Sequence, residues 1–568
     1  MDTRILTPEL SVSPQIFPQD VAALRTAGFR ALICNRPDGE GNDQPLFSEI
    51  EKAARAAGMD AVYMPVESGK VTDEQARQFG EALARLPRPV LAYCRTGMRS
   101  ATMWALSQTG KSSLTDILES AQRAGYDMSA VTRRIANAGS TALDISAATH
   151  DVVVVGGGAA GIAVTASMLS RNPGLDVVII DPADVHYYQP GWTLVGRGIF
   201  QAPDTARTMG SLIPRGAQWI KSAVAAFDPQ SNSVILDGCR VVRYKQLVVC
   251  PGLKLDWGGI EGLAETLGSN GVTSNYRYDL APYTWKRVQS LRGGRALFTQ
   301  PPMPIKCAGA PQKAMYLSAD HWRRQGVLRN IDIGFYNSGA ALFGVAEYVP
   351  ALMEYVKAYG IDLNFGHTLT SIDGPGKTAT FVRTGPDGSK ETVRESFDMI
   401  HVVPPQKAPD FIRVSPLADA AGWVDIDPAT MRHKQYENIH ALGDAGNTGN
   451  AKTAAAARAQ APVVAHNVLA ALGLAKGQAQ YNGYGSCPLT VERGKIVLAE
   501  FLYGGKVAPS FPTWLIDGTR PSRLAWLLKE RILPFVYWKG MFKGHEWMVH
   551  PKLVDVADPH KIREDASA

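Results

Sequence analysis

The chain has 568 residues, which is too long for one hydrophobic core, and at ~150 residues per domain we expect three or four domains. Its 59 Lys and Arg nearly balance its 53 Asp and Glu, which leaves a net charge of +6, and 45% of its residues are apolar. These values are typical of a globular protein and exclude the strongly basic composition of a nucleic-acid-binding chain.

Targeting segments and disulfides are not expected. The first residues, Met1 to Ser13, have neither an apolar h-region nor an Arg-rich amphipathic pattern, so we expect no signal or transit peptide. No run of ~20 apolar residues predicts a membrane-spanning helix. Six cysteines without a CxxC pair predict reduced thiols rather than a disulfide framework or a zinc site. They are Cys34, Cys94, Cys239, Cys250, Cys307 and Cys487.

Residues 1–137 are predicted to form a small α/β domain. The pattern predicts strands at Ala31–Cys34, Ala61–Val66 and Val90–Tyr93, and helices at Ile50–Ala57 and Thr72–Leu86. The last strand leads directly into Cys94 and a helical run. The dipole of the helix favours the thiolate of a cysteine at this position, and Arg95 and Arg99 add positive charge. We therefore predict a nucleophilic cysteine in an anion-binding loop, with a buried structural thiol as the alternative.

Cys94–Ser100 and Asn35–Asp38 resemble the dual-specificity-phosphatase-like and rhodanese-like families. Phosphatases of this type place five residues between the cysteine and the arginine, whereas four residues separate Cys94 from Arg99. The shorter loop is similar to that of rhodaneses and favours a carrier of sulfane sulfur, with a phosphatase as the second interpretation. Cys94 and Arg99 are the candidate catalytic residues of this domain in both cases.

A dinucleotide-binding unit is predicted after a linker at residues 138–149, which are rich in Ala, Ser and Thr. Val152–Val155 is a β-branched run typical of a strand buried on both faces, and Gly156, Gly158 and Gly161 follow it with G-x-G-x-x-G spacing. Such glycines permit a tight turn, close approach of a pyrophosphate and packing of helix on strand. Asp181 ends the next strand, where a ribose hydroxyl is held. The pattern alone does not separate FAD from NAD.

Further elements of this part follow in order. Strands are expected around Val224 and over Gln246–Cys250, which ends in a turn at Gly252. A second dinucleotide-like unit begins at Ile331–Ala340, but it lacks the glycine triplet and has Asn337–Ser338 in the turn. Tight approach of a pyrophosphate is disfavoured there, so NAD(P)H is not expected as the electron source.

Two later segments carry charged groups beside a helix start. Gly443 and Asp444 end a predicted strand, and Lys452 is expected to open a helix whose N-terminus, together with Lys452, stabilises negative charge on a bound cofactor. Cys307 precedes another helix and is flanked by Lys306 and Lys313, which are expected to lower the pKa of its thiol.

The chain from about residue 150 to 552 is similar to the sulfide:quinone oxidoreductases of mitochondria and many bacteria. The motifs that carry the resemblance are His186–Gly191, Lys306–Lys313, Gly422–Asp425, Gly443–Asp444, Ala451–Ala456, Tyr484–Pro488 and Leu533–Trp538. The resemblance implies non-covalent FAD and a quinone as electron acceptor. The candidate cofactor-binding residues are Gly156, Gly158, Gly161, Asp181, Gln189, Val224, Gly252, Gly443, Asp444 and Lys452, the last also a candidate catalytic residue.

The same resemblance implies two cysteines beside the flavin, one of which adds sulfide and passes two electrons to FAD as a persulfide forms. Cys307 matches the first. The second is expected directly after Gly443–Asp444, where this chain has Ala445. Cys250, Cys487 and Cys94 are the candidates to replace it, although the cysteine of the family segment that contains Cys487 is interpreted as structural. Because a partner is then missing, we expect sulfane sulfur to pass from Cys307 to Cys94 or to a small thiol.

Residues 481–568 are predicted to be a quinone- and membrane-interface region. Leu524, Leu527, Leu528 and Ile532 form a helical stripe with Arg523, Lys529 and Arg531 around it, and Pro534 is expected to break the helix. Apolar groups beside Lys and Arg suit a helix in a membrane interface. A pair of core-packing helices is the alternative.

The sequence thus predicts an α/β protein. It consists of a phosphatase- or rhodanese-like domain, an FAD-dependent disulfide-reductase-like part with two Rossmann-type folds over residues 150–480, and a C-terminal amphipathic membrane-docking region. The predicted function is oxidation of sulfide, or a related sulfur nucleophile, at Cys307 in a cytoplasmic, peripherally membrane-associated enzyme. One alternative is an FAD protein without sulfide turnover whose first domain is a phosphatase. Another is a non-enzymatic sulfur sensor or carrier.

Overall fold

A computed structural model describes residues 2–41, 44–68, 70–128, 131–136, 148–237, 240–449 and 451–554. The chain divides into two compact units. The first unit comprises residues 1–149, 222–244 and 410–418, and the second comprises residues 150–221, 245–409 and 419–568. Most of the predicted linker, and Cys239, lie outside the described residues.

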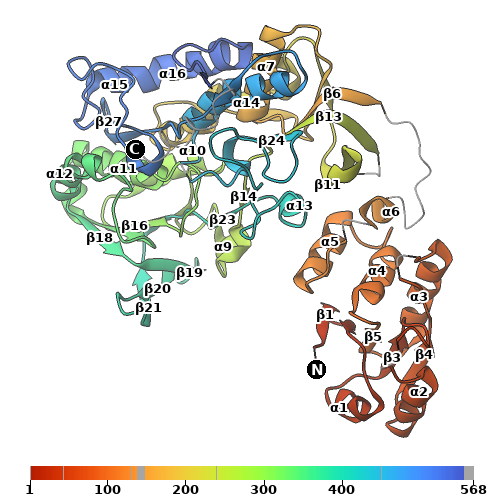
Figure 1. Ribbon diagram of the computed structural model, residues 1–568. Coiled ribbons are helices and arrows are strands. Elements are labelled where there is room, and N and C mark those ends of the chain that lie inside the picture. The colour runs from red at the N-terminus through yellow and green to blue at the C-terminus, as the bar shows by residue number, and fades with distance from the viewer. Residues whose placement is uncertain are drawn as a thin grey trace. The chain divides into compact units, whose positions relative to one another are not determined.

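The first unit is built on a five-stranded sheet with the order β1-β2-β5-β3-β4 (Figure 1). The strands are β1 (Arg4–Thr7), β2 (Leu10–Ser13), β3 (Ala31–Cys34), β4 (Asp60–Tyr63) and β5 (Val90–Tyr93). All pairs are parallel except β1 with β2. The helices are α1 (Val21–Thr26), α2 (Phe47–Ala56), α3 (Asp73–Arg85), α4 (Met98–Ser107), α5 (Leu114–Arg123) and α6 (Thr132–Ala136).

Both faces of this sheet are buried, which explains its continuous apolar strands. Leu32 and Leu91 face α1 and α2, where they pack with Ile50, whereas Ile33 and Ala92 face α3 and α4 and pack with Phe79. The expected strands over Ala31–Cys34 and Val90–Tyr93 are therefore confirmed with the same bounds. Helix α3 is confirmed but is one residue shorter at each end than predicted, and at its start Thr72 is the N-cap, which accepts a hydrogen bond from the Gln75 amide.

The second unit contains a sheet in which the strands β10-β7-β6-β13 are neighbours in this order, and β24 pairs with β13. These strands are β6 (Thr149–Val155), β7 (Val177–Ile180), β10 (Ala217–Ile220), β13 (Val241–Val249) and β24 (Ile439–Ala441). The antiparallel strands β11 (Val224–Asp228) and β12 (Ser233–Leu236) belong to the first unit. Strands β10, β7 and β6 are parallel, as are β13 and β24. Helices α7 (Ala159–Arg171) and α14 (Ala454–Ala471) pack on each other.

A second parallel sheet of the same unit has the order β15-β22-β16-β17-β18. These strands are β15 (Val272–Thr273), β16 (Gly294–Gln300), β17 (Ile331–Asn337), β18 (Ile361–Phe365) and β22 (Met399–His401). Helices α10 (Ala281–Ser290), α11 (Ala310–Arg324) and α12 (Val349–Tyr359) accompany it, followed by the antiparallel strands β19 (His367–Asp373), β20 (Thr378–Thr384) and β21 (Lys390–Ser396).

The last part of the described chain begins with the hairpin β26 (Gly485–Glu492) and β27 (Lys495–Phe501), which packs in the core beside α11. An irregular helical segment then runs through α15 (Arg523–Leu527), a π-helical turn (Leu528–Ile532), α16 (Leu533–Phe535) and a second π-helical turn (Val536–Gly540). The expectation that Pro534 breaks the helix is wrong, because the backbone stays helical on both sides of it, between the two π-helical turns.

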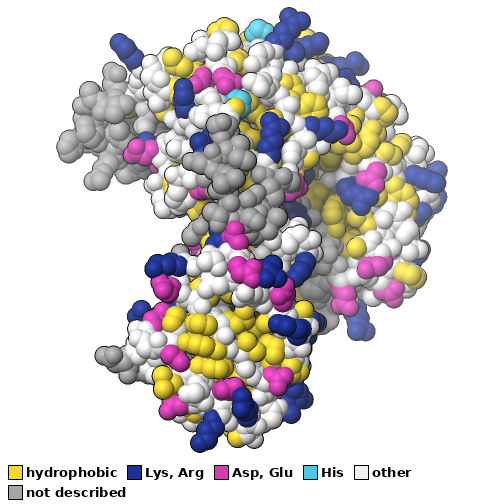
Figure 2. Space-filling model, turned by 90° about the vertical axis from the view of Figure 1, so that its right-hand side faces the viewer, with side chains coloured by type: hydrophobic (Ala, Val, Ile, Leu, Met, Phe, Trp, Pro, Cys, Tyr) yellow, Lys and Arg dark blue, Asp and Glu magenta, His cyan; other side chains and the backbone are white. Residues whose placement is uncertain are grey.

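The mixed charges on the surface agree with the nearly balanced charge of the sequence. On the face shown in Figure 2, Lys and Arg side chains lie among Asp and Glu side chains over both units. In the described part of the chain, no helix combines the length and the apolar character needed to cross a membrane.

Candidate active site

The glycine loop after β6 has the geometry of a pyrophosphate cradle. Gly156 has a φ of +107°, and a Cβ there would lie 2.6 Å from the carbonyl oxygen of Cys250. A Cβ on Gly161 would lie 1.8 Å from the Gly156 oxygen, so α7 packs on the loop only with glycine at this position. Gly158 differs, because a Cβ there would meet no protein atom within 4 Å. The open space beside Gly158, at the N-terminus of α7, is where a phosphate fits.

A cavity of about 1670 Å³ extends from this loop through the second unit. Most of the predicted site residues line it: Gly158, Asp181, Gln189, Gly252, Cys307, Gly443, Asp444 and Lys452. Val224 does not line it and instead begins β11, where it pairs with Leu236. One carboxylate oxygen of Asp181 accepts a hydrogen bond from the Gly157 amide and the other accepts one from Ala183. The cavity size, the glycine cradle and the carboxylate beside it fit an FAD.

Cys307 is held at the wall of this cavity by its backbone. Its φ is +49°, its amide donates to the carbonyl oxygen of Lys452, and its own carbonyl accepts from the Ala310 amide. The Tyr276 hydroxyl also donates to that carbonyl, at 3.3 Å. Helix α11 starts at Ala310, so the sulfur is fixed directly before a helix N-terminus, as the sequence predicts.

Cys487, in β26, lies behind Cys307, with 3.9 Å between the two sulfurs. A Cβ on Gly309 would come within 2.4 Å of the Cys487 sulfur, so glycine at 309 permits this approach. Two expectations are therefore wrong: Cys487 is not a separate structural thiol, and Cys307 does not lack a partner. Ala445 is fully buried and takes no part in the pair. The hypothesis of a sulfur relay from Cys307 to Cys94 rested on a missing cysteine and therefore loses its support.

Lys313 controls the charge of the pair. Its ammonium group donates to the Cys307 sulfur at 3.1 Å and is itself buried. The pKa of the Cys307 thiol is held well below its usual value, because Cys487 donates a hydrogen bond to its sulfur and Lys313 adds a positive charge, although burial acts in the opposite direction. The pKa of Cys487 is raised by its hydrogen bond to Cys307 and by burial. Cys307 is therefore the thiolate of the two.

Lys529 is a further cation at this site that the sequence pattern missed. The stripe predicts an exposed side chain, yet Lys529 is 4% exposed, lines the cavity and donates to the carbonyl of Pro190. Burial, reinforced by the charge of Lys313, lowers the pKa of Lys529 to about 7. It belongs to a π-helical turn, whose wider period rotates the side chain away from the position that a regular helix gives it.

Lys306 and Lys452 are both tied to other groups. The Lys306 ammonium donates to Gln189, at 2.7 Å. The Lys452 ammonium donates to the carbonyls of Asp444 and Gly446 and lies over the Trp423 ring, 4.0 Å from its centre. Burial lowers the pKa of Lys452 to about 8. The expectation that Lys452 opens a helix is wrong by two residues, because Thr453 caps α14 and the helix starts at Ala454.

The turn after β17 differs from the glycine loop after β6. The side-chain oxygen of Asn337 accepts from the Gly339 amide, and its nitrogen donates to the Ala341 carbonyl. The asparagine thus fills the turn with its own side chain. The next α-helix, α12, starts only at Val349, so no helix N-terminus follows this strand directly.

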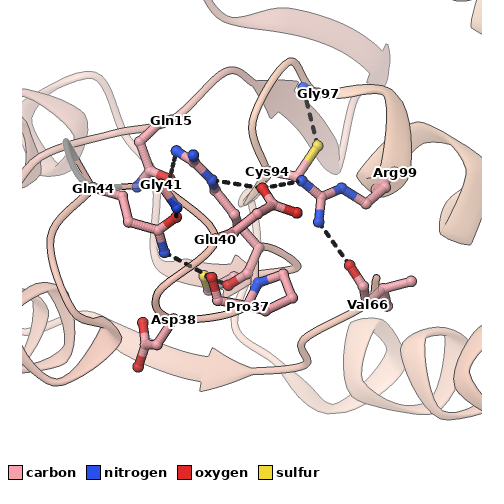
Figure 3. A network of polar contacts seen from close by, with 12 residues as sticks. Gln15, Pro37, Asp38, Glu40, Gly41, Gln44, Val66, Cys94, Gly97 and Arg99 are labelled. Atoms are coloured by element: carbon pink, nitrogen blue, oxygen red, sulfur yellow. Dashed lines mark hydrogen bonds and ion pairs between the residues drawn. The ribbon is translucent and has the colours of Figure 1, made fainter. Parts of the chain in front are cut away.

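The predicted site of the first unit lies at the start of α4 (Figure 3). Cys94 is buried, and its sulfur accepts a hydrogen bond from the Gly97 amide at 3.1 Å. Gly97 has a φ of +89°, and a Cβ there would collide with the Tyr126 hydroxyl. Arg99 donates to the Val66 carbonyl and to the carboxylate of Glu40. Glu40 is a member of this site that the sequence analysis did not select.

Two family models match the chain. The phosphatase-like domain of beta-lactamase hydrolase-like proteins matches residues 2–111, and the pyridine nucleotide-disulphide oxidoreductase family matches residues 150–288. The "Beta-lactamase hydrolase-like protein" of Agrobacterium fabrum is 34% identical over 126 residues, which are 22% of this chain and 29% of that protein. The fold and the cavity therefore define a flavoprotein of the disulphide oxidoreductase class with a phosphatase-like domain before it.

Relatives that match a longer part of the chain identify its family. "Sulfide:quinone oxidoreductase, mitochondrial" of Dictyostelium discoideum is 43% identical over 398 residues, which are 69% of this chain and 86% of that protein. The mouse protein of the same name is 36% identical over 396 residues, 70% of this chain and 87% of that protein. The chain belongs to the sulfide:quinone oxidoreductase family. The solved sulfide:quinone oxidoreductase of Aquifex aeolicus shares the fold, with a TM-score of 0.59 and 19% identity over 71% of this chain and 97% of that one.

Proposed function

We propose that the enzyme oxidises sulfide at the Cys307–Cys487 pair, passes the electrons through FAD to a quinone and delivers sulfane sulfur to a thiol acceptor. The observation that carries this proposal is the 3.9 Å approach of the two sulfurs beside Lys313, at the wall of a cavity that begins at the glycine loop. The relatives named for this reaction agree with it.

Sulfide enters the cycle by attack on a disulfide between the two cysteines. Cys307 is the accessible sulfur, because it lines the cavity, whereas Cys487 is buried behind it. Hydrosulfide forms a bond to the Cys307 sulfur, the bond to Cys487 breaks, and Cys487 leaves and takes up the proton of the hydrosulfide, in agreement with its raised pKa. Cys307 then carries the persulfide.

The sulfane sulfur leaves in a second exchange. An acceptor thiolate attacks the outer sulfur of the persulfide and takes it, and Cys307 is released as a thiolate. The low pKa of Cys307 makes it the better leaving group, since thiolates of low pKa depart faster. FAD, when bound, supplies the two-electron acceptor that returns the resulting dithiol to the disulfide. The groups that would hold the FAD are Gly158, the Asp181 carboxylate and the N-terminus of α7.

The C-terminal helical segment supports access of a lipid-soluble quinone. Leu528, Ile532, Leu533, Val536 and Tyr537 line the cavity. Leu524, Leu527 and Phe535 of the same region are exposed and do not line the cavity, and Trp547 and Met548 are exposed and also line it. One segment thus offers an apolar outer surface to a membrane and a wall to the cavity. The cytoplasmic location stays a prediction from the sequence.

Anaerobic mixing of the purified protein with sulfide and free cysteine, as the thiol acceptor, tests the proposal. We expect bleaching of the flavin absorbance, and its recovery when a soluble quinone is added. Bleaching should be lost in Cys307→Ser and in Cys487→Ser. A flavin that stays oxidised in the wild-type protein, with FAD confirmed bound, would refute sulfide oxidation.

A second candidate function concerns the first unit. The Cys94 sulfur is buried, accepts a hydrogen bond from the Gly97 amide and lies at the start of a ten-residue helix. We propose that Cys94 is a nucleophile, with either a sulfane sulfur or a phosphate ester as its target. Release of phosphate from an aryl phosphate, compared with transfer of sulfur from a persulfide, separates the two chemistries.

A further inference from the structure

The cradle around Cys94 already contains a carboxylate. The Oε2 atom of Glu40 accepts two hydrogen bonds, one from Arg36 at 2.8 Å and one from Arg99 at 2.7 Å. Figure 3 shows this carboxylate beside Arg99, which comes from the same loop and helix as Cys94. The guanidinium groups of Arg36 and Arg99 are therefore joined through one acidic side chain.

The burial of the three side chains is unequal. The side chains of Arg36 and Arg99 are 7% and 9% exposed, whereas that of Glu40 is 24% exposed. Arg99 is also held from the other side, because it donates to the Val66 carbonyl at 2.7 Å. The arginines are thus fixed in the protein, and the carboxylate is the member of the group that has most access to water.

The electrostatic environment keeps Glu40 ionised. Its pKa is lowered by the hydrogen bond from Arg99 and by the bond from Arg36, against the effect of burial. Burial would lower the pKa of Arg99, but its bond to Glu40 and the nearby Cys94 sulfur raise it instead. At neutral pH the group therefore holds two positive charges and one negative charge.

Arginine pairs are the usual binding groups for phosphate, because a guanidinium presents parallel N–H donors to its oxygens. Here the donors that face the carboxylate are occupied. An incoming dianion must displace Glu40 from both arginines or meet its negative charge at close range. A substrate with an uncharged or singly charged reacting end meets a smaller barrier.

We propose that Glu40 is a specificity-determining residue of the Cys94 site, which holds the place of an anion on Arg36 and Arg99 and selects against dianionic phosphate esters. The inference rests on Cys94 as a nucleophile. It does not depend on the flavin or on Cys307.

Alkylation of Cys94 in the full-length protein tests this inference, with mass spectrometry of the peptide that contains Cys94. Inorganic phosphate is the probe, and its protection of Cys94 against iodoacetamide gives its affinity. We expect phosphate to protect Glu40→Gln at concentrations about tenfold lower than it protects the wild type, since a charged hydrogen-bonding competitor is removed. Glu51→Gln is the matched control, because Glu51 pairs only with Arg55 on the surface of α2.

A second measurement does not depend on small differences in folding. Iodoacetate carries a negative charge and iodoacetamide does not, so the ratio of their rates at Cys94 reports the local charge. We expect this ratio to rise about tenfold in Glu40→Gln and to stay unchanged in Glu51→Gln. An unchanged ratio and unchanged phosphate protection in Glu40→Gln would overturn the inference. If Cys94 reacts with neither reagent in any variant, the proposal that Cys94 is a nucleophile is wrong, and so is the inference about Glu40.

Discussion

The sulfur of Cys487 lies 3.9 Å from the sulfur of Cys307, although their positions are 180 residues apart in the sequence. The first cysteine precedes α11 and the second belongs to β26, which packs against the same helix. Packing of the hairpin on the helix therefore creates the reactive pair.

Removal of Cys487 should stop turnover. Cys487→Ser leaves Cys307 without a disulfide partner, so sulfide-dependent quinone reduction should fall by about a thousandfold or more. The flavin content should be unchanged, because Cys487 does not line the cavity. Cys34→Ser, which removes a buried thiol from the first unit, is the control and should keep its quinone reductase activity. Full activity in Cys487→Ser would exclude the pair as the reacting centre.

Lys313 should set the pH at which Cys307 reacts. In Lys313→Met the ammonium beside the sulfur is lost, so the pKa of Cys307 should rise. The alkylation of Cys307 by iodoacetamide at neutral pH becomes slower as a result, and its pH profile moves to higher pH. Lys306→Met is the matched control, because Lys306 donates to Gln189 and not to the sulfur. Equal profiles for the two variants would contradict the assigned role.

Lys529 should cost stability at neutral pH. Its pKa of about 7 in the fold lies below the value of 10.5 for a free lysine, so the unfolded chain binds more protons between these values. The penalty is therefore complete below the folded pKa and disappears as the pH rises toward the unfolded one. Lys529→Met should raise the thermal unfolding midpoint at pH 7, by a gain that falls by roughly half at pH 9. A gain that does not depend on pH would mean that packing, not charge, is responsible.

Substitution of two glycines of the loop after β6 should impair the protein in different ways. Gly161→Ala places a Cβ 1.8 Å from the Gly156 oxygen, so it should destabilise the protein even without FAD. Gly158→Ala meets no protein atom and has an ordinary backbone, so it should leave the apoprotein as stable as the wild type. FAD affinity should nevertheless fall by about tenfold or more in Gly158→Ala, because the methyl group occupies the phosphate space. Unfolding of the apoprotein and flavin titration measure the two effects.

The exposed apolar residues of the C-terminal segment should bind membranes. Leu527→Asp and Phe535→Asp place charges on side chains that are 48% and 57% exposed and that do not line the cavity. Sedimentation with anionic vesicles should weaken by about tenfold, whereas turnover with a water-soluble quinone should be retained. Leu46→Asp, at an equally exposed position of the first unit, is the control. Unchanged sedimentation in both C-terminal variants would place the membrane contact elsewhere.

Local patterns were enough for much of the fold. The strands Ala31–Cys34 and Val90–Tyr93 and the glycine loop at Gly156 follow from runs of neighbouring residues, and the structure places them as predicted. Cys307 before a helix is equally local. These features depend on backbone propensity and on burial of a strand on both faces, and a short window of sequence contains both.

The pairings across the site were not predictable in this way. Cys487 joins Cys307 only through the packing of β26 on α11, and no window of sequence contains both. Its position in the motif Tyr484–Pro488 was the available signal. Lys529 was misplaced because a π-helical turn changes the period on which the stripe was counted. Glu40 was missed because its partners, Arg36 and Arg99, are brought to it from two different strand ends.

The hairpin that carries Cys487 also has a consequence for synthesis of the protein. Leu489, Val497 and Phe501 of this hairpin complete the core that Met315 and Trp322 of α11 begin. A ribosome therefore releases α11 and Cys307 well before the strands that cover them. Until residue 501 has emerged, the nascent chain carries an unpaired thiol next to an uncovered apolar helix, and domains generally fold as units once their sequence is complete. Premature termination in this region would leave a flavin loop of normal sequence but no assembled redox centre.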